Sequence, residues 1–482
     1  MGANPREPNQ VRTGRPLSSI VAAALLCGAA PAVAQQAPAP ASATLAPALV
    51  TTHSLPASPA VNVYYQLRGD APIWFRDAAA TEAAKLLPAI LERGQLDGLA
   101  DGPDLARMVE AAIARAKDPA LGTRPGSKPG SFLAEDKLLS AAWVQYVRAL
   151  KAPVAGMTYG DPGLAPPVPK PDRILDEAQK ASSLLRHVQS VASVNPVYAQ
   201  LRDAAWNRSR HGALAPDPRV AANLDRARML PASGRYVLVN AATAQLWMYE
   251  DGKVQDMMKV VVGKRDTPTP MLAGTIHYVT FNPYWNIPTD VARKNVAPLV
   301  LKRGTAYLRA ARYEVASDWT GQATVLDPET IDWQAVVDGT REVHVRQLPG
   351  PANMMGALKF GFVNDLGIYL HDTPFKELLG KSKRNFSLGC VRVEDATRLA
   401  RWFLGREPVA PSSEPEQYVR LDKGVPVYIT YLTAVADGGR LAFVDDVYGR
   451  DPRADTGLAE LQPIPSSASA SASGAGIPAS RR

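Results

Sequence analysis

The stretch RYVLVNAATAQLWMYEDGKV, residues 235–254, marks a change in the spacing of apolar residues along the chain. Its two halves, RYVLVN and QLWMYEDGKV, favour a period of about two residues, which predicts a pair of β-strands. Asp251-Gly252 supplies two residues that tolerate positive φ, as a tight hairpin turn requires. The β pattern continues to Leu432 in KVVVGK, GTIHYVTFN, KFGFVN, GIYLHD and VPVYITYL. We therefore predict a β-rich domain over residues 233–450.

Upstream of this stretch, apolar residues recur at three-and-four spacing, which is typical of amphipathic helices. One set is Leu105, Met108, Val109, Ala112 and Ile113, and another is Leu138, Leu139, Ala142, Trp143, Tyr146, Val147 and Leu150. Connections rich in Pro and Gly at 118–130 and 159–171 separate helical stretches. Residues 61–230 are therefore predicted to form an all-α domain, and the predicted fold class is α+β multidomain.

Three further segments differ from both domains. Residues 289–341 interrupt the β pattern with a helical stretch and loops, and insertions of this length are commonly lids or binding elements. Residues 35–60 are rich in Ala, Pro, Ser and Gln, which predicts a flexible linker. Residues 451–482 end in PSSASASASGAGIPAS and are predicted to be disordered.

The first 34 residues have the pattern of an export signal. Arg6, Arg12 and Arg15 precede the apolar stretch Leu17–Ala30, and Ala32-Val33-Ala34 offers a cleavage site. A lipoprotein site at Cys27 is the alternative, but the bulky Leu26 before it disfavours this. No later segment has the roughly eighteen apolar residues of a membrane span. We therefore predict a periplasmic protein, cleaved after Ala34, with no integral membrane span.

The composition narrows the possible partners and the roles of the cysteines. The formal charge is +8, but no Lys/Arg run is interleaved with aromatic residues, so nucleic acid is disfavoured and an anionic envelope polymer fits better. Cleavage would leave Cys390 as the only cysteine, which excludes an internal disulfide. The six histidines are scattered, with no pair at metal-ligand spacing. Cys390 is then either an inert buried residue or a reactive thiol.

The stretch YLHDTPFKELLGKSKRNFSLGCVRVED, residues 369–395, contains the groups that a reactive thiol needs. His371 lies nineteen positions before Cys390 and could take the thiol proton, with Asp372 orienting it through its carboxylate or its backbone carbonyl. Gly389 permits a turn that directs N–H groups at a developing oxyanion. Four basic residues form either a solvated loop or a site for substrate carboxylates: Lys376, Lys381, Lys383 and Arg384.

Two motifs in this stretch, Tyr369-Leu-His371-Asp-Thr-Pro374 and Ser387-Leu-Gly-Cys390-Val-Arg392, resemble the YkuD-type catalytic domain of the L,D-transpeptidases. The likeness extends to the segments 282–288, 346–350 and 353–360. The helical region, including RVAANLDRARMLP at 219–231, resembles the scaffold domain of the large subfamily. The resemblance implies a sandwich-like β-rich catalytic domain, with residues 289–341 in the position of the family's capping element.

The resemblance also implies a reaction. Family members attack the bond between the L-centre of diaminopimelate and D-Ala in a peptidoglycan stem, form a thioester, and pass it to an amine to give a 3→3 cross-link. They are carbapenem targets, no cofactor or metal is expected, and other wall-synthesis enzymes are possible partners. The implied site residues are Cys390 as nucleophile, His371 as proton donor and acceptor, the main-chain carbonyl of Asp372 as its orienting group, Leu388 and Gly389 as oxyanion amides, and Tyr369, Ser387 and Arg392 in the substrate groove.

The sequence departs from the family pattern in two places. Many members have a second histidine where Leu388 stands, so His371 would act alone. Only Ala204–Arg219 occupies the place of a peptidoglycan-binding module, which is too short for one. Three alternatives stay open: a carboxypeptidase or cysteine peptidase with water as acceptor, attachment of an envelope protein to peptidoglycan, and a non-catalytic wall-binding scaffold.

Overall fold

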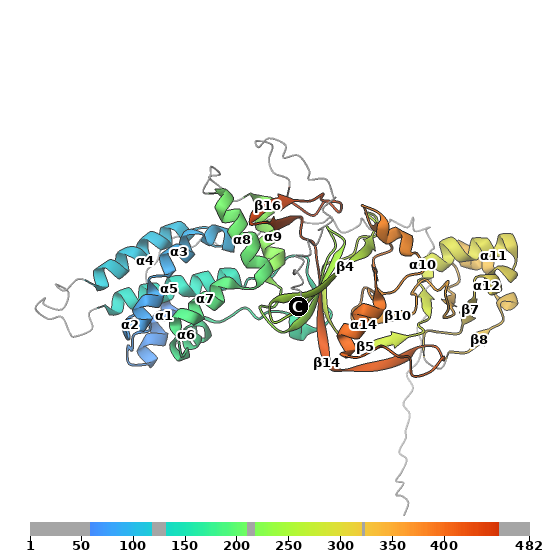
Figure 1. The fold of residues 1–482 in the computed structure, drawn as a ribbon, viewed down its shortest axis with the longest axis horizontal. Helices are drawn as coiled ribbons and strands as arrows, with labels where there is room; N and C mark the ends of the chain where they lie inside the picture. The colour runs from blue at the N-terminus through green and yellow to red at the C-terminus, as the bar shows by residue number, and fades with distance from the viewer. Residues whose placement is uncertain (1–57, 118–131, 210–216, 321–322, 453–482) are drawn as a thin grey trace, which may run out of the picture. The chain divides into compact units, whose positions relative to one another are not determined.

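The computed structural model describes residues 58–117, 132–209, 217–320 and 323–452 (Figure 1). The predicted signal peptide, the linker up to residue 57 and the tail from residue 453 lie outside these ranges. The described chain begins with helices, continues with a β-rich part and ends in a short hairpin. This order confirms the predicted fold class.

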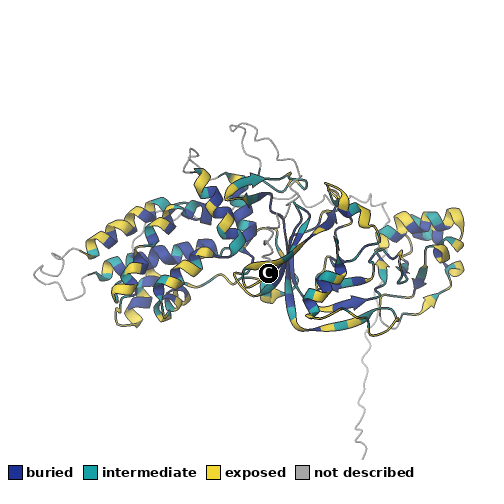
Figure 2. Ribbon diagram, in the orientation of Figure 1, coloured by how far each residue is buried: buried dark blue, intermediate teal, exposed yellow. Residues whose placement is uncertain are grey.

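The first part is helical. Proline stands at the start of several helices, where its fixed φ is favourable, and Asp77 caps α2 by accepting from the amide of Ala80. The apolar faces form one core, seen as the dark blue side of the helices in Figure 2. The α-helices are α1 Pro59–Leu67, α2 Ala78–Ala84, α3 Leu87–Glu92, α4 Gly102–Ala116, α5 Leu133–Leu150, α6 Pro171–Lys180, α7 Leu184–Ser193, α8 Pro196–Ser209 and α9 Pro218–Arg228.

The second part is a sheet that closes on itself. The strand order is β1-β5-β10-β11-β13-β4-β3-β2-β14, with β12 on β4, and β14 also pairs with β5. The strands enclose an apolar core, against which helix α14 Ala396–Leu404 packs. The bounds are β1 Thr158–Tyr159, β2 Arg235–Asn240, β3 Gln245–Glu250, β4 Lys253–Gly263, β5 Leu272–Phe281, β10 Leu358–Gly361, β11 Leu370–His371, β12 Asn385–Ser387, β13 Val391–Val393 and β14 Gln417–Thr430.

Two local features test the sequence patterns. Asp251 and Gly252 have φ of 48° and 76° and join β3 to β4, which confirms the predicted tight turn. Strand β1 lies in the region predicted to be all-α, yet it pairs in parallel with β5. Two residues are too few to produce a period in the sequence, and this strand is specified by the neighbouring strand rather than by its own pattern.

The insertion is a mixed subdomain with its own core, rather than a helical stretch with loops. Its four strands pair in the order β6-β9-β7-β8. Asn353 fixes its base, because its amide donates to the carbonyls of Pro283 at 3.1 Å, Gln347 at 3.1 Å and Leu348 at 3.0 Å. The elements are β6 Trp285–Ile287, α10 Thr289–Val291, a π-helical turn Ala292–Val296, α11 Ala297–Arg303, α12 Ala306–Ala310, β7 Tyr313–Ala316, β8 Val325–Leu326, α13 Trp333–Asp338 and β9 His344–Gln347.

The chain after β14 returns to the helices. A hairpin forms from β15 Ala434–Asp437 and β16 Arg440–Phe443. Leu432 and Ala434 belong to the helical core, and the Arg219 guanidinium lies 4.6 Å from the ring centre of Phe443. The helical part and the sheet are therefore joined by contacts as well as by the chain.

Candidate active site

Strands β11 and β13 bring the two predicted motifs together. They pair in parallel, with Leu370 opposite Val391 and His371 opposite Arg392. Side chains alternate along a strand, and Leu370 and Val391 are fully buried in the core. His371 and Arg392 therefore share the other face. Tyr369 and Cys390, one residue before each strand, fall on this same face. Burial raises the pKa of Tyr369, and the neighbouring Cys390 raises it further.

His371 is buried and its ring orientation is set by the backbone. Its Nδ1 lies 2.6 Å from the main-chain oxygen of Asp372. A carbonyl oxygen can only accept, so Nδ1 carries the proton and Nε2 carries the lone pair. Burial and the nearby charge of Arg392 lower the pKa of His371 to about 4, which the Asp372 carbonyl partly opposes. The imidazole is therefore neutral at pH 7 and able to take a proton.

The Asp372 carboxylate is used elsewhere. It accepts from Lys376 Nζ at 2.7 Å and from the Ala357 amide at 3.0 Å. Of the two ways in which Asp372 could orient His371, the structure has the backbone carbonyl. Arg384 also has structural partners, donating to the carbonyls of Val260, Thr243 and Ala244. Lys376 and Arg384 thus contact the protein itself.

Cys390 is a free, partly exposed cysteine. Its Sγ lies 3.5 Å from the carbonyl oxygen of Gly367, to which the thiol can donate. Burial raises the pKa of this thiol, while the Tyr369 amide and the Arg392 charge oppose the rise. The resting group is therefore a thiol, and its attack on a carbonyl carbon requires a base.

The turn before Cys390 is held by Ser387. The buried Ser387 hydroxyl donates to the carbonyl of Cys390 at 2.6 Å and accepts from the Gly389 amide at 3.1 Å. Gly389 has φ of 122°, which favours glycine. Ser387, predicted to bind substrate, contacts its own loop, and the Gly389 amide is already bonded. Among the residues that the structure describes, no acceptor is present for the amides of Leu388 and Cys390.

Arg392 and Tyr369 flank the thiol. No ion pair joins Arg392 to a carboxylate within the described ranges, and its Nε is buried without an acceptor. Lys359 lies opposite His371 in the sheet, with its Nζ 5.7 Å from the ring centre of Tyr369 and 3.4 Å from Glu416. The sequence did not single out Lys359 and Glu416 as site neighbours. Only the β10–β11 register reveals the first, and the second directly precedes the distant strand β14.

A hollow of about 290 Å³ lies beside the end of β11. It is lined by Asp372 and Thr373 on one side and by Asn282 and Pro351, at the base of the insertion, on the other. The segments that flank the insertion, at Asn282 and at Pro351, therefore border a cavity next to the residue that orients His371. Within the described residues, no cluster of His, Cys, Asp and Glu could hold a metal ion, and no helix there is long and apolar enough to cross a bilayer.

Comparisons with known proteins agree with this architecture. Residues 234–429 match the family model of the L,D-transpeptidase catalytic domain, YkuD, and residues 59–204 match that of the Scaffold domain. A Haemophilus influenzae protein named "Putative L,D-transpeptidase" is 27% identical over 424 residues, which are 85% of this chain and 81% of that protein.

Two solved structures also match. The Ldtfm–avibactam carbamoyl enzyme is 14% identical with a TM-score of 0.21, over 42% of this chain and 50% of that one. A cysteine-to-serine mutant of the Enterococcus faecium L,D-transpeptidase is 12% identical with a TM-score of 0.20, over 44% of this chain and 64% of that one.

Fold and family models together define a helical scaffold domain followed by a β-rich catalytic domain. The chain belongs to the L,D-transpeptidases with a YkuD catalytic domain.

Proposed function

We propose that this protein is a peptidoglycan L,D-transpeptidase that forms 3→3 cross-links through a thioester on Cys390. One observation carries the proposal. The free thiol of Cys390 lies one residue before β13, and the neutral ring of His371, oriented by the Asp372 carbonyl, lies on the paired strand β11, so the two share one face of the sheet. A neutral base on the same face of the sheet as a protonated thiol suits attack on an amide at neutral pH.

The reaction takes two acyl transfers. Nε2 of His371 takes the thiol proton as Sγ attacks the carbonyl carbon of the third stem residue, and the oxyanion accepts from the amides of Cys390 and Leu388. The C–N bond to D-Ala breaks, His371 returns the proton to the leaving amine, and a thioester remains. The side-chain amine of a second stem then attacks the thioester, loses a proton to His371 and releases the thiol.

The remaining assignments follow from this reaction. Arg392, which has no carboxylate partner among the described residues, would bind a stem carboxylate, and Tyr369 would line the groove. The family's action on stem peptides places the enzyme outside the cytoplasm. A periplasmic protein cleaved after Ala34 would keep Cys390 as its only thiol, and no cofactor enters the reaction.

The experiment that tests this function is product analysis with a purified disaccharide-tetrapeptide. A cross-linked dimer with one D-Ala released per link supports transfer. Tripeptide alone would indicate hydrolysis, and product formed only with an added envelope protein would indicate attachment to a protein lysine. Binding without any product would indicate a wall-binding scaffold.

A further inference from the structure

The loop between β4 and β5 contains a buried threonine that contacts the nucleophile turn. Thr269 is 0% exposed, and its hydroxyl accepts from the Gly263 amide at 2.8 Å and donates to the Gly389 carbonyl at 2.8 Å. An amide can only donate and a carbonyl can only accept, so the direction of the hydroxyl proton is determined. Thr269 therefore holds the carbonyl of the residue that precedes Cys390.

The Gly389 carbonyl and the Cys390 amide belong to the same peptide unit. Because this unit is planar and trans, its C=O and N–H point in opposite directions. A bond from Thr269 to the Gly389 oxygen thus turns the Cys390 N–H away from Thr269. That N–H has no acceptor among the described residues, and it is a proposed oxyanion donor. Without Thr269, this glycine-containing turn would be freer to rotate the peptide.

Two residues near the end of the described chain hold Thr269. The hydroxyl of Tyr448 donates to the Gly263 carbonyl at 2.8 Å and accepts from the Thr269 amide at 3.4 Å. Arg450 Nη2 donates to the Thr269 carbonyl at 3.1 Å. The backbone N–H and C=O of Thr269, and the C=O of Gly263, are therefore hydrogen-bonded to the segment that follows β16.

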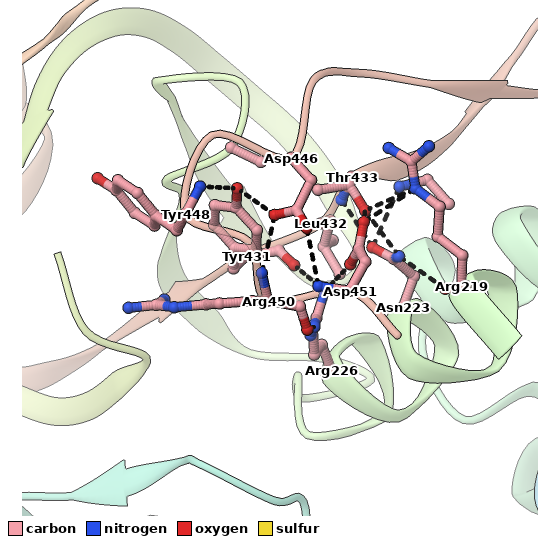
Figure 3. A network of polar contacts seen from close by, with 12 residues as sticks. Arg219, Asn223, Arg226, Tyr431, Leu432, Thr433, Asp446, Tyr448, Arg450 and Asp451 are labelled. Atoms are coloured by element: carbon pink, nitrogen blue, oxygen red, sulfur yellow. Dashed lines mark hydrogen bonds and ion pairs between the residues drawn. The ribbon is translucent and has the colours of Figure 1, made fainter. Parts of the chain in front are cut away.

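This segment, residues 446–451, is itself folded around a carboxylate (Figure 3). Asp446 accepts from the Tyr431 hydroxyl at 2.8 Å, from the Arg450 amide at 3.0 Å and from the Asp451 amide at 2.9 Å. The rings of Tyr431 and Tyr448 stack at 5.0 Å. These contacts fix the direction in which Tyr448 and Arg450 leave the segment.

Helix α9 clamps the same segment from the other side (Figure 3). Asp451 pairs with Arg219 at 2.9 Å and with Arg226 at 2.7 Å, and Arg226 also donates to the Tyr431 carbonyl at 3.0 Å. A continuous series of hydrogen bonds therefore runs from α9 through residues 446–451 and Thr269 to the peptide that precedes the nucleophile.

We propose that Thr269 is a positioning residue that aims the Cys390 amide at the oxyanion, and that residues 446–451, clamped by α9, hold Thr269 in place. The inference rests on the proposed function, because it concerns the oxyanion of the acylation step. The nucleophile turn then depends on the last helix before the sheet, and the contact of α9 with residues 446–451 serves catalysis as well as folding.

The test compares two reactions of the same thiol. Acylation by a tetrapeptide stem passes through an oxyanion, whereas alkylation by iodoacetamide does not. Thr269→Val keeps the shape and removes the hydroxyl, and it should slow acylation about tenfold to a hundredfold while alkylation changes less than about twofold. Thr269→Ser should restore acylation. Thr275 lies on β5, and its hydroxyl is hydrogen-bonded to Asp161. Thr275→Val, which removes that hydroxyl, is the matched control and should leave both rates unchanged.

The link to α9 is tested with Tyr448→Phe and Asp451→Asn, which each keep the shape of the side chain. Both should slow acylation more than alkylation, and adding either to Thr269→Val should cause little further loss because they act through the same hydroxyl. Equal loss of both reactions, or wild-type acylation by Thr269→Val, would overturn the inference. If the wild-type protein forms no acyl-enzyme at all, the proposed function fails instead, and the two failures are distinguishable.

Discussion

His371 donates a hydrogen bond from Nδ1 to the main-chain oxygen of the next residue, Asp372, at 2.6 Å. The base is therefore oriented by a backbone group at the end of β11 rather than by a charged side chain. The adjacent Asp372 carboxylate bonds to Lys376 and Ala357 instead. In Ser-His-Asp enzymes the carboxylate itself stabilises the imidazolium, and replacing it by an amide costs about 10⁴ in rate.

The first prediction follows from this difference. Asp372→Asn keeps the main-chain carbonyl and an oxygen that can accept from the Ala357 amide, so the acylation rate should fall less than about tenfold. Single-turnover D-Ala release measures it. A loss of acylation rate near the roughly 10⁴ seen when a triad carboxylate is replaced would mean that the Asp372 side chain, and not its carbonyl, supports His371.

The second prediction concerns stability at low pH. His371 is buried, and its pKa is lowered from an ordinary 6.5 to about 4, so between these values the unfolded chain binds more protons than the folded one. Stability should therefore fall as the pH drops from 6.5 towards 4, by up to roughly 3 kcal/mol for this group.

Urea unfolding at pH 7 and at pH 4.5 measures this effect, with His371→Gln as the control. His187, whose pKa is also lowered by burial, contributes equally to both proteins and cancels in the comparison. The wild type should lose more stability than the variant on acidification. Equal losses would show that His371 protonates freely in the folded protein.

The third prediction separates the base from the thiol. His371→Ala should lower D-Ala release by roughly 10²–10⁴, because no second histidine is present at Leu388 to replace it. Alkylation of Cys390 should persist at high pH, where the thiolate forms unaided. The rates of D-Ala release and of Cys390 alkylation, measured from pH 6 to 10, show whether the variant loses the first reaction and keeps the second. An unchanged rate of release at pH 7 would exclude His371 as the base.

The fourth prediction concerns the insertion. Ile287 and Val345 lie opposite each other in antiparallel β6 and β9, so an Asn-Gly turn can replace residues 288–344. Both side chains are buried, so they are changed to Thr in the trimmed protein, where the lost packing would expose them.

If the insertion closes over the donor stem, the trimmed protein should lose at least about tenfold in dimer formation but less than about twofold in iodoacetamide alkylation of Cys390. Dimer yield and alkylation rate are measured on the same preparation. A parallel decline of both would mean that the segment only supports the fold.

Residue types and spacing predicted the parts of the molecule that local sequence specifies. The Asp251-Gly252 turn follows from two residues that tolerate positive φ, and the long strands follow from their period. The strands of the insertion have two to four residues, too short for a period, and β7 and β8 fall within residues 289–341, which were expected to be a helical stretch and loops.

Residue types in the sequence predicted the reactive groups of the candidate site, but not the residues that hold those groups in place. Cys390 and His371 have side chains that few other residues can replace chemically, and β11 and β13 do pair. Thr269, Tyr448 and Arg450 are ordinary residue types far from Cys390 in sequence, and only the packing of the β4–β5 loop against residues 446–451 brings them together. The Ser387 hydroxyl could bind substrate or hydrogen-bond to its own loop, and only its bonds to Gly389 and Cys390 show that it does the second.

The central claim is that Cys390 carries the acyl group, and intact mass spectrometry tests it most directly. After incubation with a purified disaccharide-tetrapeptide, the wild-type protein should gain the mass of the donor less D-Ala, at Cys390. Cys390→Ser should gain almost nothing, since a hydroxyl is far less acidic than a thiol, and Cys390→Ala nothing. A Cys390→Ala protein that still gains this mass, or still forms cross-linked dimer, would contradict the account.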